Sequence, residues 1–363
     1  MGIFDTEQRT ISPALIIGTG MIGTSIGLAL TKAGVPVYLR DSDPAHVEAA
    51  EALGAGSAAL PLAEEVHLVV VAVPPEKLAE QVAEALSAYP EATVTDVGSV
   101  KSTVLKQLHE TDAEAELYRY CGSHPMAGSE KSGPLAAKAD MFVDRTWVVT
   151  PHDSASAHAV LDVRELAQTC GARITTLGAA HHDEAVAQVS HLPQLVSSLL
   201  AGMLTDVPPE HLKLAGQGLR DTTRIADSNP GLWRQIIEAN SEAVHSQLEI
   251  LRDHLNWLLD GFNDGTKLEA FLAEGRAGRQ SLPGKHGTAA QAFAQLAIEI
   301  PDEVGALAGI FAAIKDTGIN IEDVAIDHDQ NRDVGYLEVA VAPDKADALK
   351  ELLLAAGWRM KEE

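Results

Sequence analysis

The chain has 363 residues, which is long enough for two or three domains, each with its own core. It carries 27 lysines and arginines against 52 aspartates and glutamates, and this formal net charge of −25 argues against nucleic acid as a partner. No run of about 18 apolar residues predicts a membrane span, and no basic stretch before an apolar one predicts a secretory signal. Two cysteines, Cys121 and Cys170, suit a reducing cytoplasm.

A glycine-rich turn follows the short apolar run Ala14–Ile17 and leads straight into a helical pattern of small residues. In this strand–turn–helix context Gly18 permits the tight turn, Gly20 lets backbone N–H groups approach phosphate, and Gly23 lets helix and strand pack closely. A dinucleotide pyrophosphate then lies at the positive end of the helix. The residues predicted to bind the cofactor in this turn are Gly18, Gly20, Met21, Ile22 and Gly23.

Residues 11–150 alternate short apolar runs with helical patterns, which predicts a doubly wound, mostly parallel sheet. We therefore expect a Rossmann-like α/β nucleotide-binding domain over residues 11–178. The candidate strands are Ala14–Ile17, Val35–Leu39, Leu68–Val73, Thr93–Asp96, Tyr118–Gly122 and Trp147–Thr150.

Asp41 ends the second candidate strand. An acid at this position accepts hydrogen bonds from the adenosine ribose hydroxyls and repels a 2′-phosphate, which favours NAD over NADP. The adjacent Arg40 could tolerate that phosphate, and a solvated turn residue is the alternative interpretation of Asp41. Val73 and Pro74 end another strand in a rigid turn, so we expect them to line the cofactor crevice.

From Ala179 to about Gly275 the pattern is helical, which predicts an all-helical domain over residues 179–280. The stretch Trp233–Phe262 is long and apolar on a broad face; such a layer often pairs with its copy, so we expect a homodimer. An ordinary buried helix is the alternative. The segment Gly275–Thr288 is rich in Gly, Arg, Ser and Pro, which predicts a linker.

Residues 290–363 predict a separate ferredoxin-like unit with the order βαββαβ. It resembles an ACT regulatory domain through Ile300-Pro-Asp-Glu-Val-Gly-Ala-Leu-Ala and Asp316-Thr-Gly-Ile-Asn-Ile. The resemblance implies that Gly305 and Asn320 help to hold an amino acid between paired domains; a small fold without a ligand is the alternative. The expected strands are Ala294–Ile300, Asn320–His328, Gly335–Ala342 and one from Trp358, and the expected helices are Val304–Thr317 and Ala346–Ala356.

His124 is the first candidate catalytic residue. It follows a candidate strand and precedes Pro125, which restricts it to extended conformations, so we expect its imidazole at the carboxyl edge of the sheet. A neutral imidazole there can accept a hydroxyl proton while a hydride leaves the same carbon. Ser99, in another strand-end loop, could bond the same hydroxyl or orient the ring. A structural histidine is the alternative.

Arg224 is a candidate anion-binding residue. It lies three residues after Asp221 and four after Arg220, so the three side chains can share one helix face. A guanidinium fork suits bidentate carboxylate binding, and Asp221 could hold that fork in place. A solvated ion pair on a helix is the alternative.

Two further polar groups fall in the helical region. Ser190 and Gln194 share a helix face, and Pro193 between them removes one backbone bond and is expected to bend the helix. His181-His182-Asp183 could suggest a metal site, but a helix start with His and Asp in its first turn is the preferred interpretation.

Five segments in order resemble the prephenate dehydrogenase family, which includes arogenate dehydrogenases. The resemblance implies NAD as cofactor, catalysis by His124 with Ser99, and prephenate binding by Arg224. It also implies a pocket closed by Glu130 and Trp233, with the Ser129 hydroxyl presented to the substrate. The segments are Asp96-Val-Gly-Ser-Val-Lys-Ser102, Ser123-His-Pro-Met-Ala-Gly-Ser-Glu-Lys-Ser-Gly133, Ser190-His-Leu-Pro-Gln194, Arg220-Asp-x-x-Arg-Ile-Ala226 and Pro230-x-x-Trp233.

The activity implied by the resemblance is NAD-dependent oxidative decarboxylation of prephenate to 4-hydroxyphenylpyruvate, with L-tyrosine as a feedback effector. The family usually has His at the position of Gln194, so the choice between prephenate and arogenate stays open. A non-catalytic sensor of nucleotide and amino acid is a second alternative. An unrelated 3-hydroxyacid dehydrogenase should carry a catalytic lysine early in the second domain, and no lysine lies between Lys138 and Lys213.

Overall fold

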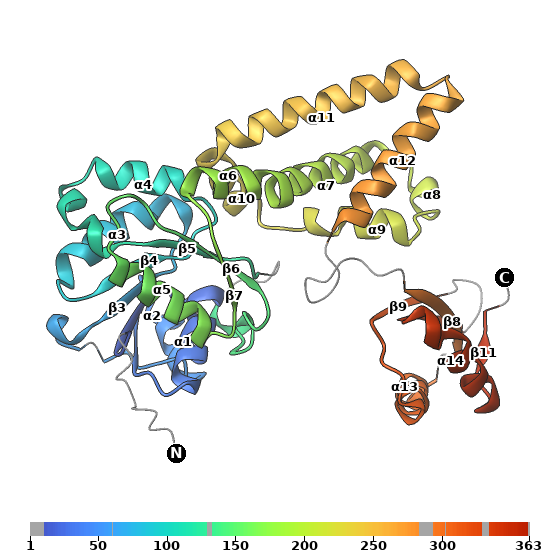
Figure 1. The fold of residues 1–363 in the computed structure, drawn as a ribbon, viewed down its shortest axis with the longest axis horizontal. Helices are drawn as coiled ribbons and strands as arrows, with labels where there is room; N and C mark the ends of the chain where they lie inside the picture. The colour runs from blue at the N-terminus through green and yellow to red at the C-terminus, as the bar shows by residue number, and fades with distance from the viewer. Residues whose placement is uncertain are drawn as a thin grey trace. The chain divides into compact units, whose positions relative to one another are not determined.

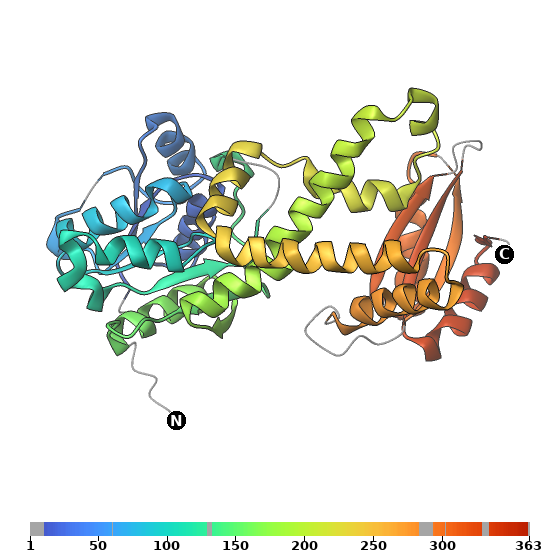
Figure 2. The same ribbon diagram turned by 90° about the horizontal axis from the view of Figure 1, so that it is seen from above.

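The computed structural model divides the chain into two compact units, Met1–His254 and Leu255–Glu363 (Figures 1 and 2). Within the described residues, no helix has both the length and the apolar character that a membrane span needs. The structure describes residues 11–59, 61–128, 133–282, 293–301, 303–328 and 334–361.

A parallel sheet of four strands, in the order β2-β1-β3-β4, forms the centre of the first unit. Alternate residues of β1 enter two cores: Ala14 and Ile16 pack with helices α1 and α5, whereas Leu15 and Ile17 pack with α3 and α4. A sheet covered on both faces favours apolar residues at every position, which is why the two central strands β1 and β3 are continuous apolar runs in the sequence. The strands are β1 (Ala14–Ile17), β2 (Val37–Arg40), β3 (Leu68–Val71) and β4 (Thr93–Asp96).

Helices and short 3₁₀ segments surround this sheet (Figure 1). The helices are α1 (Met21–Lys32), α2 (Pro44–Ala52), α3 (Leu78–Ala88), α4 (Ser102–His109) and α5 (Ala157–Thr169). The 3₁₀ segments are η1 (Ala63–Glu65), η2 (Pro75–Lys77), η3 (Asp112–Arg119) and η4 (Pro134–Ala136).

A second sheet contains β5 (Gly122–Pro125), β6 (Thr146–Thr150) and β7 (Arg173–Thr176); β5 runs antiparallel to β6. The expected strand Tyr118–Gly122 is therefore wrong. Arg119 ends a 3₁₀ segment because its guanidinium donates hydrogen bonds to the carbonyl oxygens of Leu86, Tyr89 and Ala92. As a result His124 lies inside the strand rather than after it.

A series of helices completes the first unit. The bend expected at Pro193 takes the form of a π-helical turn directly before it, where the missing N–H of proline disturbs the regular ladder. The expected continuous stretch Trp233–Phe262 is divided at Asn240. The elements are α6 (Ala179–Val186), the π turn η5 (Ala187–His191), α7 (Leu192–Met203), η6 (Leu204–Asp206), α8 (Pro209–Leu212), α9 (Gln217–Thr223), η7 (Arg224–Ala226), α10 (Pro230–Ala239) and α11 (Ser241–Gly261), which continues into the second unit.

The second unit holds helix α12 (Gly265–Ser281) and a separate antiparallel sheet in the order β11-β8-β10-β9. The βαββαβ order is confirmed. The linker predicted from Gly275 is wrong for residues 275–281, which form the end of α12 because the helix-favouring Ala, Arg and Gln outweigh the two glycines. The other elements are β8 (Ala294–Pro301), α13 (Ala306–Thr317), β9 (Asp323–His328), β10 (Val334–Val341), α14 (Pro343–Ala355) and β11 (Arg359–Met360).

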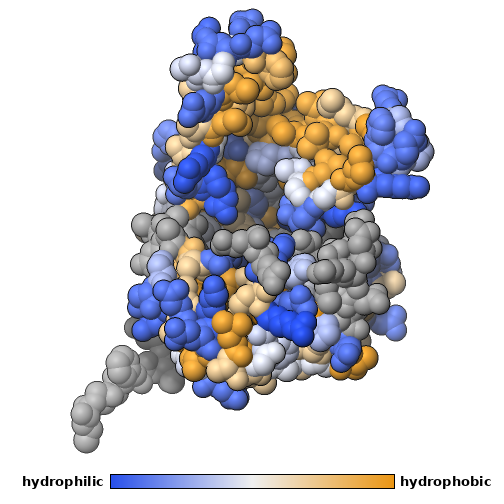
Figure 3. Space-filling view, turned by 90° about the vertical axis from the view of Figure 1, so that its right-hand side faces the viewer, coloured by the Kyte–Doolittle hydropathy of each residue, from blue (hydrophilic) through white to orange (hydrophobic). Residues whose placement is uncertain are grey.

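The helical segments expose large apolar side chains. In α7, Leu199 and Met203 are each 63% exposed, and in α11 Leu255 and Leu259 are 53% and 62% exposed. Figure 3 shows apolar residues gathered in the upper part of one side of the molecule. Exposed apolar surface of this kind is typical of an interface with another protein chain.

Candidate active site

The glycine turn has the geometry that a dinucleotide requires. Gly18 has φ +97°, and a Cβ atom there would collide with the carbonyl oxygen of Ala72. A Cβ atom at Gly23 would collide with the carbonyl oxygen of Gly18, so helix α1 can pack against β1 only through glycine. A Cβ atom at Gly20 would meet nothing within 4 Å, which leaves open space at the start of α1 for a phosphate.

Asp41 lies beside this turn, at the end of β2. Its Oδ2 accepts hydrogen bonds from Thr19 N at 2.6 Å and from Thr19 Oγ1 at 3.1 Å, and its Oδ1 accepts one from Asp43 N at 2.9 Å. Burial alone would raise the pKa of Asp41, but these hydrogen bonds lower it below its ordinary value, so the side chain is ionised. A pocket of about 350 Å³ adjoins the carboxylate, and its apolar lining includes Leu39, Pro44 and Val47.

Val73 and Pro74 follow β3 at the same edge of the sheet. Val73 lies close to the glycine turn, because a Cβ atom on Gly18 would come within 3.1 Å of Val73 Cγ1. Pro74 precedes η2, and helix α10, which carries Trp233, contacts η2. The predicted cofactor edge and one predicted substrate residue are therefore on neighbouring elements.

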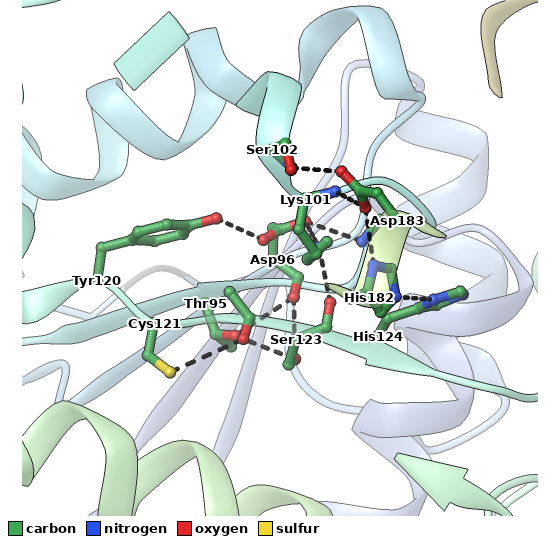
Figure 4. A network of polar contacts seen from close by, with 12 residues as sticks. Thr95, Asp96, Lys101, Ser102, Tyr120, Cys121, Ser123, His124, His182 and Asp183 are labelled. Atoms are coloured by element: carbon green, nitrogen blue, oxygen red, sulfur yellow. Dashed lines mark hydrogen bonds and ion pairs between the residues drawn. The ribbon is translucent and has the colours of Figure 1, made fainter. Parts of the chain in front are cut away.

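His124 is the first of three side chains that form a row linked by hydrogen bonds (Figure 4). Its Nδ1 lies 2.9 Å from Nε2 of His182, and Nδ1 of His182 lies 2.8 Å from Oδ1 of Asp183. His124 is half-buried in β5, whereas His182 and Asp183 are buried in α6. The strand and the helix thus place an imidazole, a second imidazole and a carboxylate in a chain of hydrogen bonds.

The surroundings of these groups set their charges. Burial, and then the neighbouring His182, Lys101 and His191, lower the pKa of His124 well below its ordinary value, so His124 is neutral. Burial would raise the pKa of Asp183, but hydrogen bonds from His182, Lys101 and Ser102 lower it, so Asp183 is ionised. A neutral imidazole is in the correct state to accept a proton.

A buried ion pair fixes the backbone next to His124. Lys101, 2% exposed, donates from Nζ to the carboxylate of Asp96 and to the carbonyl oxygen of Ser123, the latter at 2.7 Å. Asp96 also accepts a hydrogen bond from the hydroxyl of Tyr120 at 2.7 Å. Because Ser123 directly precedes His124, this network fixes the backbone from which His124 projects.

The same loop reaches the carboxylate of Asp183 through its main chain. Lys101 N donates to Oδ1 of Asp183 at 2.9 Å, and Ser102 N donates to Oδ2 at 2.7 Å. Asn240 donates from Nδ2 to the carbonyl oxygen of Asp183 at 2.8 Å and lies 3.1 Å from Nδ1 of His191. Burial lowers the pKa of His191 to about 4. Each of these polar groups therefore has a protein partner.

Ser99 lies half-buried in the loop between β4 and α4, two residues before Lys101 in the sequence. Within the described residues it makes no hydrogen bond to His124, so the ring is oriented by His182 instead. Ser129 and Glu130 lie outside the described residues.

The predicted substrate residues of the helical segment are more open. Arg224 is exposed and begins the 3₁₀ segment η7, after α9 has ended. Within the described chain, the expected pairing of Asp221 with Arg224 is not present: Asp221 accepts a hydrogen bond from Gln217 Nε2 at 2.7 Å. The helical face expected to carry Arg220, Asp221 and Arg224 together is interrupted by this change of helix type.

Helix α7 and the π turn before it carry the remaining predicted positions. Gln194 is buried, with its Nε2 3.5 Å from Ser198 Oγ, and Ser190 is half-buried. The ring of Trp233 meets the ring of His191 edge to face, with centroids 6.1 Å apart. Both α9 and η7, where Arg224 lies, contact α7. Of the predicted substrate residues, Ser190, Gln194, Asp221 and Arg224 thus occupy adjoining elements.

Comparison with known proteins agrees with this arrangement. The model described as "Prephenate dehydrogenase, nucleotide-binding domain" matches residues 26–176, and "Prephenate dehydrogenase, dimerization domain" matches residues 178–269. A Streptomyces niveus protein named a probable prephenate dehydrogenase is 34% identical over 358 residues, covering 95% of this chain and 98% of that protein. The chain belongs to the prephenate dehydrogenase family.

Solved structures of the prephenate dehydrogenase family have the same fold. Prephenate dehydrogenase from Aquifex aeolicus, solved with hydroxyphenyl propionate and NAD⁺, has a TM-score of 0.66 at 28% identity and covers 74% of this chain and 97% of that one. Arogenate dehydrogenase from Synechocystis has a TM-score of 0.63 at 26% identity and covers 74% and 98%. This family member is therefore an NAD-dependent oxidoreductase with a nucleotide-binding domain and a helical dimerisation domain.

NAD is the cofactor of this member of the prephenate dehydrogenase family. The turn at Gly18, Gly20 and Gly23 fits it, because it combines open space at the start of α1 with contacts that exclude larger residues. Within the described residues, no group of three or more His, Cys, Asp or Glu side chains is placed to hold a metal ion.

Sequence reasoning missed four residues of this prephenate dehydrogenase site: Lys101, His182, Asp183 and Asn240. Lys101 lies within the Asp96–Ser102 motif, and a lysine between small and apolar residues after a buried strand was a usable signal for a buried ion pair. His182 and Asp183 were visible only as a possible helix start. Nothing in the local sequence indicates that they lie against His124.

Proposed function

We propose that the protein catalyses NAD-dependent oxidative decarboxylation of prephenate to 4-hydroxyphenylpyruvate, with His124 as the proton acceptor. The observation that carries this proposal is the neutral His124 imidazole, which is bonded through Nδ1 to His182 and so keeps Nε2 for a substrate. The match to the prephenate dehydrogenase family over both of its domains supports the same chemistry.

The chemistry needs one proton acceptor and a pocket that holds two carboxylates. When bound, NAD supplies the acceptor for the hydride that leaves the hydroxyl-bearing ring carbon. His124 accepts the proton of that hydroxyl as positive charge develops on the carbon. Ser99 bonds the same hydroxyl. The ring carboxylate then leaves as carbon dioxide, and its bonding electrons enter the ring. The former hydroxyl oxygen takes the proton back from His124, and aromatisation makes the reaction irreversible.

Substrate binding falls to the helical segment. Arg224 binds a carboxylate of the substrate through its guanidinium fork, and its exposure leaves that fork available. Gln194 and Ser190 face the substrate from the helix around Pro193, and Trp233 closes the pocket. Asp221, Ser129 and Glu130 complete the predicted set of substrate residues.

For the cofactor we propose contacts from the glycine turn and from Asp41. The pyrophosphate lies against Gly18, Gly20, Met21, Ile22 and Gly23 at the start of α1. The ionised Asp41 accepts hydrogen bonds from the ribose hydroxyls and repels a 2′-phosphate, while Val73 and Pro74 line the crevice.

Arogenate is the second candidate substrate, with tyrosine as the direct product. The uncharged Gln194 stands where the family usually has His, and an amide can bond either a keto or an amino side chain. An arogenate dehydrogenase is also among the similar solved structures, at an identity close to that of the prephenate enzyme.

We further propose that the enzyme is a cytoplasmic homodimer whose C-terminal unit is an ACT domain that binds L-tyrosine. The exposed apolar side chains of α7 and α11 support dimerisation, and two unbridged cysteines support a reducing compartment. In the C-terminal unit, Gly305 has φ +93° at the start of α13 and Asn320 precedes β9. Both are exposed, and Asn320 donates from Nδ2 to Oε1 of Glu322 at 2.9 Å.

Initial rates on prephenate and arogenate, each with NAD and with NADP, test the activity. Formation of reduced cofactor is followed by its near-ultraviolet absorbance, and the product is identified by chromatography. We expect NAD-dependent turnover of prephenate with equal amounts of carbon dioxide and 4-hydroxyphenylpyruvate. Turnover of arogenate alone would select the second candidate, and binding of NAD without turnover of either would indicate a sensor.

A calorimetric titration with L-tyrosine tests the effector site in the full-length protein. We expect binding that Asn320→Ala weakens while leaving initial rates without tyrosine unchanged. Equal tyrosine affinity in both proteins would instead place tyrosine in the active site as a product analogue.

A further inference from the structure

When both imidazoles are neutral, the row formed by His124, His182 and Asp183 has only one arrangement of protons that satisfies all of its hydrogen bonds. The carboxylate of Asp183 accepts from three N–H groups: the main chains of Lys101 and Ser102 and the Nδ1 of His182. An ionised carboxylate can only accept, so the proton between it and His182 belongs to His182 Nδ1.

The proton positions then follow along the row. A neutral His182 with its proton on Nδ1 has an unprotonated Nε2, which can only accept a hydrogen bond. The contact of 2.9 Å between His182 Nε2 and His124 Nδ1 therefore requires the proton on His124 Nδ1. A neutral His124 with that proton has its lone pair on Nε2.

We propose that His182 and Asp183 are positioning residues that hold His124 in the tautomer with Nδ1 protonated and Nε2 free to accept a proton. The inference rests on the proposed function, because it concerns the state in which His124 acts as the base. Neither positioning residue touches the substrate: both act through the ring of His124.

The same row also accommodates the charge that forms during turnover. When His124 Nε2 accepts the hydroxyl proton, the ring becomes an imidazolium and its Nδ1 proton is shared with His182 Nε2. Positive charge then extends toward the Asp183 carboxylate. Within the described residues, the other charged and titratable groups that act on His124 are Lys101, already paired with Asp96, and His191, which burial keeps neutral near pH 7.

A substitution of Asp183 tests whether its carboxylate sets the tautomer of His124. In Asp183→Asn the amide nitrogen can donate to His182 Nδ1, which moves the His182 proton to Nε2 and forces His124 into the tautomer without a free Nε2. We expect kcat to fall by about 10²–10⁴-fold, as for an Asp→Asn change behind a catalytic histidine. KM for the substrate and Kd for NAD should change by less than about threefold.

Two replacements of His182 separate hydrogen bonding from packing. His182→Leu fills the space without an acceptor, and His182→Gln offers an amide oxygen that can accept from His124 Nδ1. We expect His182→Leu to lose about a hundredfold or more in kcat, and His182→Gln to retain at least about tenfold more activity than His182→Leu. His181→Leu is the matched control, because His181 is the adjacent histidine on α6 and is exposed; its kcat should equal that of the wild type.

Proton–nitrogen correlation spectra of histidine-labelled protein read the tautomer directly and need no active enzyme. The His124 signals are assigned by their loss in His124→Asn. We expect a protonated Nδ1 and an unprotonated Nε2 in the wild type, and a mixture of tautomers in His182→Leu. A wild-type His124 protonated on Nε2 would overturn the proposal even if no variant of His182 or Asp183 folds.

The kinetic outcomes separate this inference from the proposed function. Full activity of His182→Leu in an enzyme that His124→Asn inactivates would overturn the positioning role alone. Equal losses in His182→Leu and His182→Gln would also overturn it, because they would indicate packing only. Full activity of His124→Asn would instead refute the role of His124 as base.

Discussion

The buried corner formed by Lys101, His124, His182 and Asp183 differs from the helical segment around Arg224 in how its side chains are held. In the corner, Lys101, His182 and Asp183 are buried and each is held by hydrogen bonds from elements far apart in the sequence. In the segment, Arg224 and Asp221 are exposed, and among the described residues Asp221 is bonded to Gln217, one helical turn away. The proposed proton acceptor is thus fixed before substrate arrives, whereas the groups proposed to bind carboxylates are exposed and adjustable.

This difference agrees with the demands of each task. A proton acceptor works only in one orientation and protonation state, which a rigid polar network can maintain at low cost during the reaction. A guanidinium that recognises a charged substrate must first be accessible to it. Substitutions around His124 should therefore lower mainly kcat, and substitutions around Arg224 should raise mainly KM.

The largest expected effect is that of His124→Asn. It removes the proton acceptor while keeping a polar side chain of similar size, so kcat should fall by about two to four orders of magnitude while the substrate still binds. Steady-state kinetics check this, with His181→Asn as the control. Retention of more than about a tenth of the wild-type kcat would remove the contrast between the two regions.

Arg224→Ala should have the next largest effect, and on KM. Loss of a charged contact to a bound carboxylate costs about 2–5 kcal/mol, so KM should rise by more than about tenfold with a much smaller change in kcat. Arg234→Ala is the matched control, because Arg234 is also exposed and pairs with Glu238 on the same helix. An unchanged KM would make Arg224 an ordinary surface residue.

Asp41→Ser extends the comparison to the cofactor and should have a smaller effect. The wild type should prefer NAD, and removal of the negative charge should narrow the NAD over NADP preference by about tenfold, equivalent to about 1.4 kcal/mol. The ratio of kcat/KM values for the two cofactors measures it. A wild type that already prefers NADP would point to Arg40 instead.

The smallest expected effect is that of pH near neutrality. His124 must be unprotonated to act, and its pKa is lowered, so activity is lost only as pH falls through that lowered pKa. Between about pH 6.5 and pH 8, above the ordinary histidine value of about 6.5, kcat/KM should vary by less than about twofold. A profile with its midpoint near pH 6.5 or above would contradict the burial of the corner.

Features that depend on neighbouring residues could be predicted from the sequence. The spacing of Gly18, Gly20 and Gly23 predicted the turn before α1, where Gly18 has a positive φ and Gly23 packs against the carbonyl oxygen of Gly18. The βαββαβ order of the C-terminal unit followed from alternation and helical periodicity. His124 became a candidate through its motif and through Pro125, and its catalytic role stays a prediction.

Features that depend on contacts between distant residues could not be predicted from the sequence. The strand expected from Tyr118 fails because Arg119 is fixed by carbonyl groups about 30 residues away. The row behind His124 joins it to a helix 58 residues later. No periodicity or propensity encodes such a contact, and His182 has the local appearance of any histidine near the start of a helix.

The hydrogen bonds between Asp183 and the Lys101–Ser102 main chain affect the order in which parts of the chain can fold during synthesis. They span 81 and 82 residues, and Asn240 must arrive another 57 residues later to bond the Asp183 carbonyl. During synthesis from the N-terminus, the parallel sheet and glycine turn can fold while this corner still lacks its carboxylate. A nascent chain can therefore gain the shape of a nucleotide-binding domain well before it gains a correctly protonated base.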